Sequence, residues 1–222
     1  MSNPRYKLST KFLSHAEALI PLGSQTFSKS RTQYPPKISP LFVTHSLGCS
    51  TWDIDGNEYV DLVSSLAAVT LGYGDPEVNK AVSEQLALGV TLSLPSLLEY
   101  EVAELIGELV PSAEKVRFAK TGSDATAGAI RLARAFTNRE HVLLGGYHGW
   151  QDWYIGSTTR NKGVPNQVSA LTHQFEYNNI ESLKIKLDLL QNKVAAVIIE
   201  PMNSTYPEHN FLESVKDLTH KA

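Results

Sequence analysis

The sequence predicts an α/β fold in which helices flank a mostly parallel sheet, preceded by an N-terminal helix and a small antiparallel β-meander. From residue 76 onward, segments of helical period alternate with short apolar runs, a pattern typical of parallel sheets. Residues 194–199 form a continuous apolar run, as expected for a strand buried on both faces. Asp55-Gly56-Asn57 lies between two short β-prone runs and indicates a hairpin turn.

Residues 1–70 are predicted to form an N-terminal segment. Apolar side chains at helical spacing predict a helix over residues 6–20, which Pro21 and Gly23 end. A polar loop rich in Ser, Thr, Gln and Pro follows over residues 21–40. The strands expected in this segment cover residues 41–44, 51–54 and 59–62.

Residues 71–222 are predicted to form a larger α/β domain that is incomplete at its C-terminal end. Its expected helices cover residues 76–88, 97–109, 122–136 and 180–190, and a last helix begins at residue 210. Its expected strands cover residues 115–119, 141–145 and 194–199.

Composition excludes several classes of protein. Of the 222 residues, 42% are hydrophobic and 19% charged, and the net charge of -3 gives no reason to expect a nucleic acid or an anionic membrane as partner. No apolar run approaches the ~18 residues of a membrane span, and the N-terminus lacks the apolar core of a signal peptide. Cys49 is the only cysteine, so no internal disulfide forms and we expect a reducing, cytoplasmic location.

Thr121-Gly122-Ser123, here called the phosphate turn, leads into the helix predicted over residues 122–136. The first N–H groups of a helix lack partners within it and lie at the positive end of its dipole, so such a turn can bind an anion such as phosphate. A plain helix cap, with Thr121 as N-cap and Asp124 three residues later, explains the same residues. The two interpretations are compatible, because both use one turn.

Tyr147-His148-Gly149-Trp150 follows the strand predicted over residues 141–145. An aromatic face beside a phosphate turn suits a flat, phosphorylated, ring-containing ligand. The alternative is an aromatic cluster that only packs a loop. His141, His148 and Asp152 match no familiar metal-site spacing, so we expect no metal.

Glu200 ends the apolar strand predicted over residues 194–199, and Asn203 follows closely. Ligands of α/β sheets bind at the carboxyl ends of parallel strands, so this carboxylate is a candidate for the same site. A charge that merely emerges at the edge of the sheet is the alternative.

Ordered motifs over nearly the whole chain resemble those of the class III pyridoxal-phosphate aminotransferases, closest to the branch that contains glutamate-1-semialdehyde aminomutase. The motifs occupy residues 52–61, 71–74, 116–118, 121–126, 129–134, 147–149 and 199–201. The resemblance implies the large domain of fold-type I and pyridoxal 5'-phosphate as cofactor. It also implies amino-group transfer, by an aminotransferase or an aminomutase, between small amino-group donors and acceptors.

The resemblance also implies roles for single residues. The backbone N–H groups of Gly122 and Ser123 would hold the cofactor phosphate, and Tyr147 would stack on the pyridine ring with His148 beside it. Glu200 would join the polar network around the ring. The complete set of implied cofactor-binding residues is Gly122, Ser123, Tyr147, His148, Glu200 and Asn203.

Thr26 and Lys29 stand three positions apart in the N-terminal loop, where the aminomutase branch has a small hydroxyl residue and a basic residue that contact the substrate. The branch usually has Ser and Arg there. Lysine lacks the planar fork that binds a carboxylate through two hydrogen bonds, so this departure leaves the substrate unidentified. Lys120 and Asp124 also depart from the Asn and Glu that the family often has.

The resemblance places the Schiff-base lysine, and the aspartate that pairs with the pyridine nitrogen, after Ala222. We therefore assign no catalytic residue within the chain, and expect the N-terminal part of an aminotransferase that is inactive alone and homodimeric at full length. One alternative is a non-catalytic remnant, or a half-enzyme that needs a separate C-terminal chain. Another is a binder of phosphosugars or nucleotides.

Overall fold

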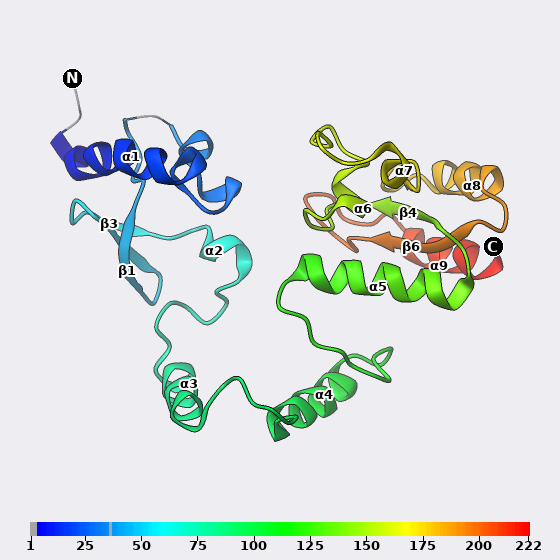
Figure 1. The fold of residues 1–222 in the computed structure, drawn as a ribbon, viewed down its shortest axis with the longest axis horizontal. Helices are drawn as coiled ribbons and strands as arrows, with labels where there is room; N and C mark the ends of the chain where they lie inside the picture. Colours follow the sequence, from blue (N-terminus) through cyan, green and yellow to red (C-terminus); the bar gives the residue numbers. More distant parts are fainter. Residues whose placement is uncertain (1–3, 36) are drawn as a thin grey trace. The chain divides into compact units, whose positions relative to one another are not determined.

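The computed structural model describes residues 4–35 and 37–222, and the chain forms two compact units (Figure 1). The first unit is Met1–Glu99 and the second is Tyr100–Ala222. The division predicted between residues 70 and 71 stays a prediction. Among the residues described, no helix combines the length and the apolar composition that crossing a membrane requires.

The first unit begins with a helix that a distant carboxylate caps. After the 3-10 turn η1 (Pro4–Tyr6), α1 spans Lys7–Leu19, close to the predicted helix. Asp55 accepts hydrogen bonds from the N–H groups of Leu8 and Ser9, at 2.6 and 2.9 Å. A carboxylate at this position satisfies free N–H groups and faces the positive end of the helix dipole, so it anchors α1 to the hairpin.

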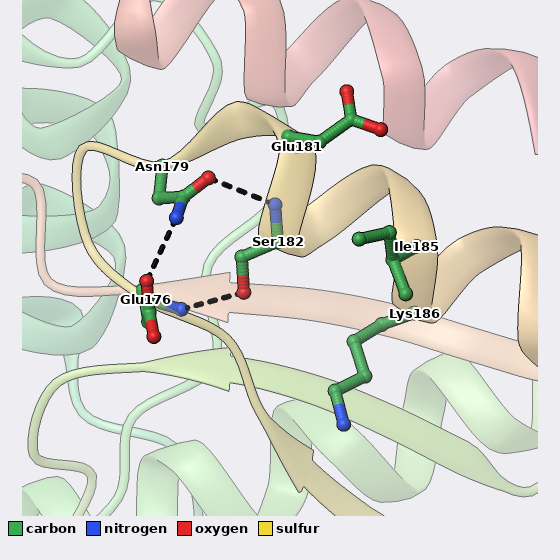
Figure 2. Close-up of a pocket in the computed structure, with 6 residues that line it drawn as sticks. All are labelled: Glu176, Asn179, Glu181, Ser182, Ile185 and Lys186. Carbon is green, nitrogen blue, oxygen red and sulfur yellow. Dashed lines mark hydrogen bonds between the residues drawn. The ribbon is translucent and has the colours of Figure 1, made fainter.

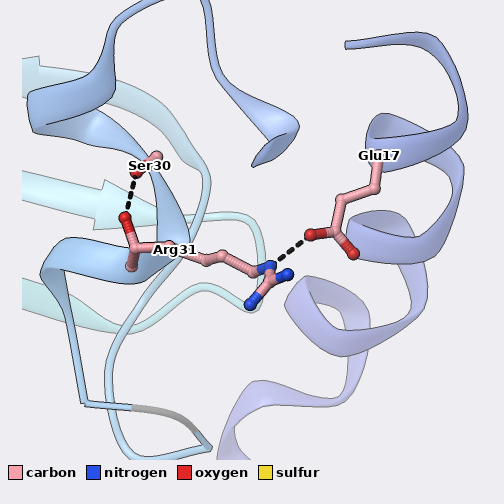
Figure 3. Close-up of polar contacts among 4 residues, drawn as sticks. Glu17, Ser30 and Arg31 are labelled. Carbon is pink, nitrogen blue, oxygen red and sulfur yellow. Dashed lines mark hydrogen bonds and ion pairs between the residues drawn. The ribbon is translucent and has the colours of Figure 1, made fainter. Parts of the chain in front are cut away.

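Three short 3-10 turns occupy much of the loop predicted over residues 21–40. Arg31 forms an ion pair with Glu17 of α1, and these two side chains connect the loop to the helix (Figure 3). The hydroxyl of the buried Ser30 lies 2.7 Å from that of Thr32. The turns are η2 (Pro21–Gly23), η3 (Phe27–Lys29) and η4 (Arg31–Gln33).

An antiparallel sheet in the order β1-β2-β3 confirms the predicted meander, with each strand displaced by a few residues. The strands are β1 (Val43–Leu47), β2 (Ser50–Asp53) and β3 (Glu58–Val60). The predicted turn is held by Asp53, whose carboxylate accepts from the N–H groups of Asp55 and Asn57 and from the Tyr59 hydroxyl. Burial raises the pKa of Asp53, but the hydrogen bond from the Asn57 side chain, together with those just named, lowers it below its usual value.

Helices follow the sheet. The turn α2 (Ser64–Ala67) has positive φ at all four residues. Helices α3 (Pro76–Leu88) and α4 (Leu97–Leu109) have the predicted bounds, and α4 contains the point at which the two units divide. Asp75 caps α3 by accepting from the two N–H groups at its first turn, which explains why α3 begins where the sequence predicted.

The second unit contains a parallel sheet in the order β5-β4-β6, which confirms the predicted sheet type. The strands are β4 (His141–Gly145), β5 (Thr172–Gln174) and β6 (Val194–Ile199). Successive side chains of β4 point to opposite faces, so Val142 and Leu144 join a core cluster with Ile130 of α5 (Gly122–Thr137). Leu143 joins the other cluster, with residues of α8 (Ile180–Leu189) and α9 (Phe211–Lys221).

The helices α5, α8 and α9 confirm the predicted helices, with ends that agree to within one residue. The sequence did not predict β5 or the short helices α6 (Asp152–Ile155) and α7 (Asn166–Ser169). Each of these elements is only three or four residues long, too short to show a hydrophobic period.

Two predictions about strands were wrong. Residues 115–119 form no strand, because no segment of the described chain pairs with them. Strand β6 is not buried on both faces: Val194 is buried, but the other five residues are only partly buried. Within the described residues β6 is an edge of the sheet, with β4 on one side only, and this position explains its exposure.

Candidate functional site

The phosphate turn begins α5 with the predicted cap. The Thr121 hydroxyl accepts from the Asp124 N–H at 3.2 Å, and the Asp124 carboxylate accepts from the Thr121 N–H at 3.1 Å. The N–H groups of Gly122 and Ser123 have no acceptor among the described residues. The side of Gly122 is also open, since an added Cβ would meet no atom within 4 Å. The turn is therefore capped and still offers two N–H groups to an anion.

Residues 146–151, here called the aromatic loop, follow β4 and present the ring of Tyr147. This side chain is 62% exposed. One contact is an edge-to-face packing against Tyr154, with ring centroids 5.5 Å apart. The N–H of Tyr147 donates to Glu200 Oε2 at 2.9 Å. The backbone of Tyr147 is thus held while most of its ring remains available to a flat ligand.

His148 points into the core instead. Its ring is 7% exposed and packs against Trp153 and Tyr154 of α6. Its Nε2 donates to the Gly145 carbonyl oxygen at 3.1 Å. Burial lowers the pKa of His148, although the Gly145 carbonyl and the charge of Glu200 favour the protonated ring. The buried ring therefore supports the aromatic loop from the core side, and contact between His148 and a cofactor stays a prediction.

Glu200 and Asn203 lie close to Tyr147 in the structure, and their contact with a cofactor stays a prediction. Glu200 Oε2 accepts from Asn203 Nδ2 at 3.0 Å as well as from the Tyr147 N–H. Glu200 lies directly over Gly146, where φ is +94° and an added Cβ would come within 2.4 Å of Oε2. Beside these residues is a cavity of about 220 Å³, lined by Gly146, Tyr177, Glu200, Asn203, Ser204 and Thr205.

The phosphate turn and the aromatic loop are in direct contact. Ser123 Oγ accepts from the Trp150 N–H at 3.3 Å. Gly149 has φ of +111°, and a Cβ there would lie 2.3 Å from Ser123 Oγ. Only glycine at this position allows so close an approach. The phosphate turn and the aromatic loop, which the sequence assigned to the phosphate and the ring, therefore lie side by side in the second unit.

Sequence reasoning missed the two glycines that shape the site. Gly146 admits the Glu200 carboxylate and Gly149 admits Ser123. The glycines on either side of Tyr147-His148 were a visible signal, since glycine marks positions of close approach or positive φ. Which atoms approach them could be learned only from the structure.

Thr26 and Lys29 are the two residues for which the resemblance implied contact with the substrate. They belong to the first unit, where both are exposed at η3, and the Lys29 N–H donates to the Thr26 carbonyl oxygen at 3.1 Å. Their contact with a substrate stays a prediction.

A cavity of about 260 Å³ at the start of α8 contains none of the predicted site residues (Figure 2). Asn179 caps the helix, its Oδ1 accepting from the Ser182 N–H at 3.0 Å and its Nδ2 donating to Glu176 at 2.7 Å. These two hydrogen bonds explain the presence of Asn179, Ser182 and Glu176 as a helix cap. Within residues 4–35 and 37–222, no three His, Cys, Asp or Glu side chains form a group that could hold a metal ion.

Comparison with known proteins gives consistent matches over nearly the whole chain. A family model described as aminotransferase class-III matches residues 33–222. Glutamate-1-semialdehyde 2,1-aminomutase 1 of Listeria welshimeri is 36% identical, over 97% of this chain and 53% of its own length. The aminomutase of Desulforamulus reducens is 34% identical, over 98% of this chain and 54% of its own.

The fold also matches that of a solved enzyme. An omega-transaminase from Sphaerobacter thermophilus superposes with a TM-score of 0.87 and 28% identity, covering 99% of this chain and 55% of that one. This chain therefore spans about half the length of the curated relatives and the solved structure that it matches.

Proposed function

The chain belongs to the class-III aminotransferase family, and from this we propose that it provides the pyridoxal 5'-phosphate site of an enzyme that transfers amino groups. The observation that carries the proposal is the contact between the phosphate turn and the aromatic loop through Ser123 and Trp150. This contact brings together two N–H groups available to a phosphate and the exposed ring of Tyr147. The cofactor needs the first for its phosphate and the second for its pyridine ring.

The residues present fit this cofactor by their chemistry. When bound, pyridoxal phosphate supplies an electron-withdrawing ring that eases the movement of an amino group between carbon atoms. The N–H groups of Gly122 and Ser123, at the positive end of the α5 dipole, would bind the phosphate. The Tyr147 ring would cover one face of the pyridine and exclude water there. Glu200 would keep the Tyr147 backbone and the Asn203 amide in place, through bonds of 2.9 and 3.0 Å.

The activity of the whole enzyme is an extension of this proposal. We infer an aminotransferase or aminomutase acting on small amino-group donors and acceptors, homodimeric at full length and cytoplasmic. Thr26 and Lys29 would contact the substrate, with Lys29 as a point charge rather than a planar fork. We assign no Schiff-base lysine within the 222 residues, so the chain alone would bind cofactor without turnover. A half-enzyme completed by a separate chain would behave in the same way.

The proposal is tested by titrating the purified chain with pyridoxal phosphate, then reducing with borohydride and mapping modified lysines by mass spectrometry. We expect saturable binding with no stoichiometric lysine label. Tyr147→Phe should bind like the parent and Tyr147→Ala about two- to thirteenfold more weakly, because stacking contributes about 0.5–1.5 kcal/mol.

Two outcomes would contradict the proposal. Binding of a nucleotide without binding of pyridoxal phosphate would favour a general phosphate binder. A single stoichiometric label, for instance on Lys120, would show that the chain contains its own Schiff-base residue.

A further inference from the structure

The first residues of α5 reach the aromatic loop through three side chains, not through Ser123 alone. Asp124 Oδ1 accepts from Gln151 Nε2 at 3.1 Å. The hydroxyl of Thr126 lies 2.9 Å from the His148 carbonyl oxygen and 3.1 Å from the Ser123 carbonyl oxygen, and donates toward both. The loop is therefore held against the helix at His148 and Trp150 through its backbone and at Gln151 through the side-chain amide.

The Thr126 contact is the shortest and best protected of the three. The bonds made by Ser123 and Asp124 are exposed and measure 3.3 and 3.1 Å, whereas the bond from Thr126 to His148 is partly buried. A partly buried hydrogen bond meets less competition from water, so its loss leaves the His148 carbonyl less well satisfied.

This bond holds the part of the loop that carries the exposed ring. The His148 side chain is fixed on the core side by the Gly145 carbonyl oxygen and by Trp153. Thr126 fixes the carbonyl of the same residue on the α5 side. Tyr147 directly precedes this doubly held residue, so the position of its ring relative to the phosphate turn depends on both contacts.

We propose that Thr126 is a positioning residue, which sets the Tyr147 ring at the correct place relative to the phosphate turn by holding the His148 carbonyl. The effect of this positioning on cofactor binding rests on the proposed function. Thr126 makes this contribution through one hydroxyl group, so serine retains it and the isosteric valine removes it. Phosphate binding at Gly122 and Ser123 needs only the helix terminus and does not depend on it.

The test compares Thr126→Val with Thr126→Ser and with a matched control, Thr219→Val. Thr219 also lies in a helix of the second unit, but among the described residues its hydroxyl donates only within α9, to the Val215 carbonyl oxygen at 2.7 Å. Hydrogen–deuterium exchange on the ligand-free chain measures opening of residues 147–151. Thr126→Val should exchange there about three- to tenfold faster, as expected for one lost hydrogen bond, with Thr126→Ser and Thr219→Val near the parent.

Binding provides the second readout. Thr126→Val should weaken pyridoxal phosphate binding by a similar factor, while inorganic phosphate, followed through the amide NMR signals of Gly122 and Ser123, binds as before. Equal exchange in Thr126→Val and Thr219→Val would overturn the positioning role, as would a Thr126→Ser variant as defective as Thr126→Val. Equal loss of both ligands would overturn it too, by showing that Thr126 only supports the helix terminus.

Failure of the proposed function gives a different result. If the parent chain binds no pyridoxal phosphate but Thr126→Val still accelerates exchange at residues 147–151, the positioning role is supported and the cofactor assignment is rejected.

Discussion

Replacing Gly146 with alanine tests whether the ends of β4 and β6 approach each other as closely as the structure shows. An added Cβ would lie 2.4 Å from Glu200 Oε2, 2.9 Å from its Cγ and 3.0 Å from its Cβ. The glutamate side chain must therefore move. When it moves, the Tyr147 N–H and the Asn203 amide lose their shared acceptor.

The cost has two separable parts. Alanine at positive φ costs about 1–2 kcal/mol relative to glycine. The displaced carboxylate adds about 1–3 kcal/mol for its lost hydrogen bonds, with the lower values applying where water reaches the freed groups. Gly163→Ala is a matched control, because Gly163 also has φ of +94° but a Cβ there would meet nothing within 4 Å. That variant carries the first cost alone.

Urea unfolding, followed by circular dichroism and tryptophan fluorescence, measures both variants. Gly146→Ala should be less stable than Gly163→Ala by about 1–3 kcal/mol. Combining Gly146→Ala with Glu200→Ala, which removes the carboxylate and Cγ, should recover part of this difference, beyond the additivity error of about 0.3–0.5 kcal/mol. Equal destabilisation by the two glycine variants, without coupling to Glu200, would refute the close approach and the site geometry built on it.

Two further predictions concern pH and helix capping. Burial, with the charges of His141 and Lys186, lowers the pKa of His173. The neutral ring therefore makes its whole contribution to the free energy of unfolding above about pH 6.5, and this contribution declines as the pH falls. His173→Gln should reduce the fall in unfolding free energy between about pH 7.5 and 5.5, measured by urea unfolding at each pH. The same pH dependence in the parent and the variant would contradict the role given to His173. Asp55→Ala should cost the first unit about 0.5–2 kcal/mol, because two N–H groups of α1 lose their acceptor. Hydrogen exchange should accelerate in α1 but not in α9, and equal protection in the parent and the variant would count against the cap.

Several elements could be predicted from the sequence because their signals are local. Helix α3 begins at Pro76 after the capping residue Asp75 and is followed by Gly89. Each end of the helix therefore depends on residues within a few positions of that end. The capped start of α5 has the same origin, since Thr121 and Asp124 bond to each other. The turn of the N-terminal hairpin was likewise visible in three adjacent residues.

Strand pairing and edge position depended on the tertiary structure. Whether residues 115–119 pair, and whether β6 lies inside a sheet or at its edge, depends on which segments lie beside them. An apolar run shows that a segment can be buried, but hydrogen-bond partners make it a strand. The short β5 had too few residues to show a period, and only its pairing with β4 defines it.

The candidate site shows the same division. The sequence by itself determined which residue types are present: a capped turn with free N–H groups, an aromatic pair between glycines, and a carboxylate after an apolar strand. The tertiary structure decided that they meet, through bonds between residues 27 positions apart, from Trp150 to Ser123, and 53 positions apart, from Tyr147 to Glu200. It also turned His148 into the core and left the ring of Tyr147 exposed. The physical reason is that caps and turns are made by neighbours in the chain, whereas close approach at Gly146 and Gly149 arises only when separate strands and helices pack together.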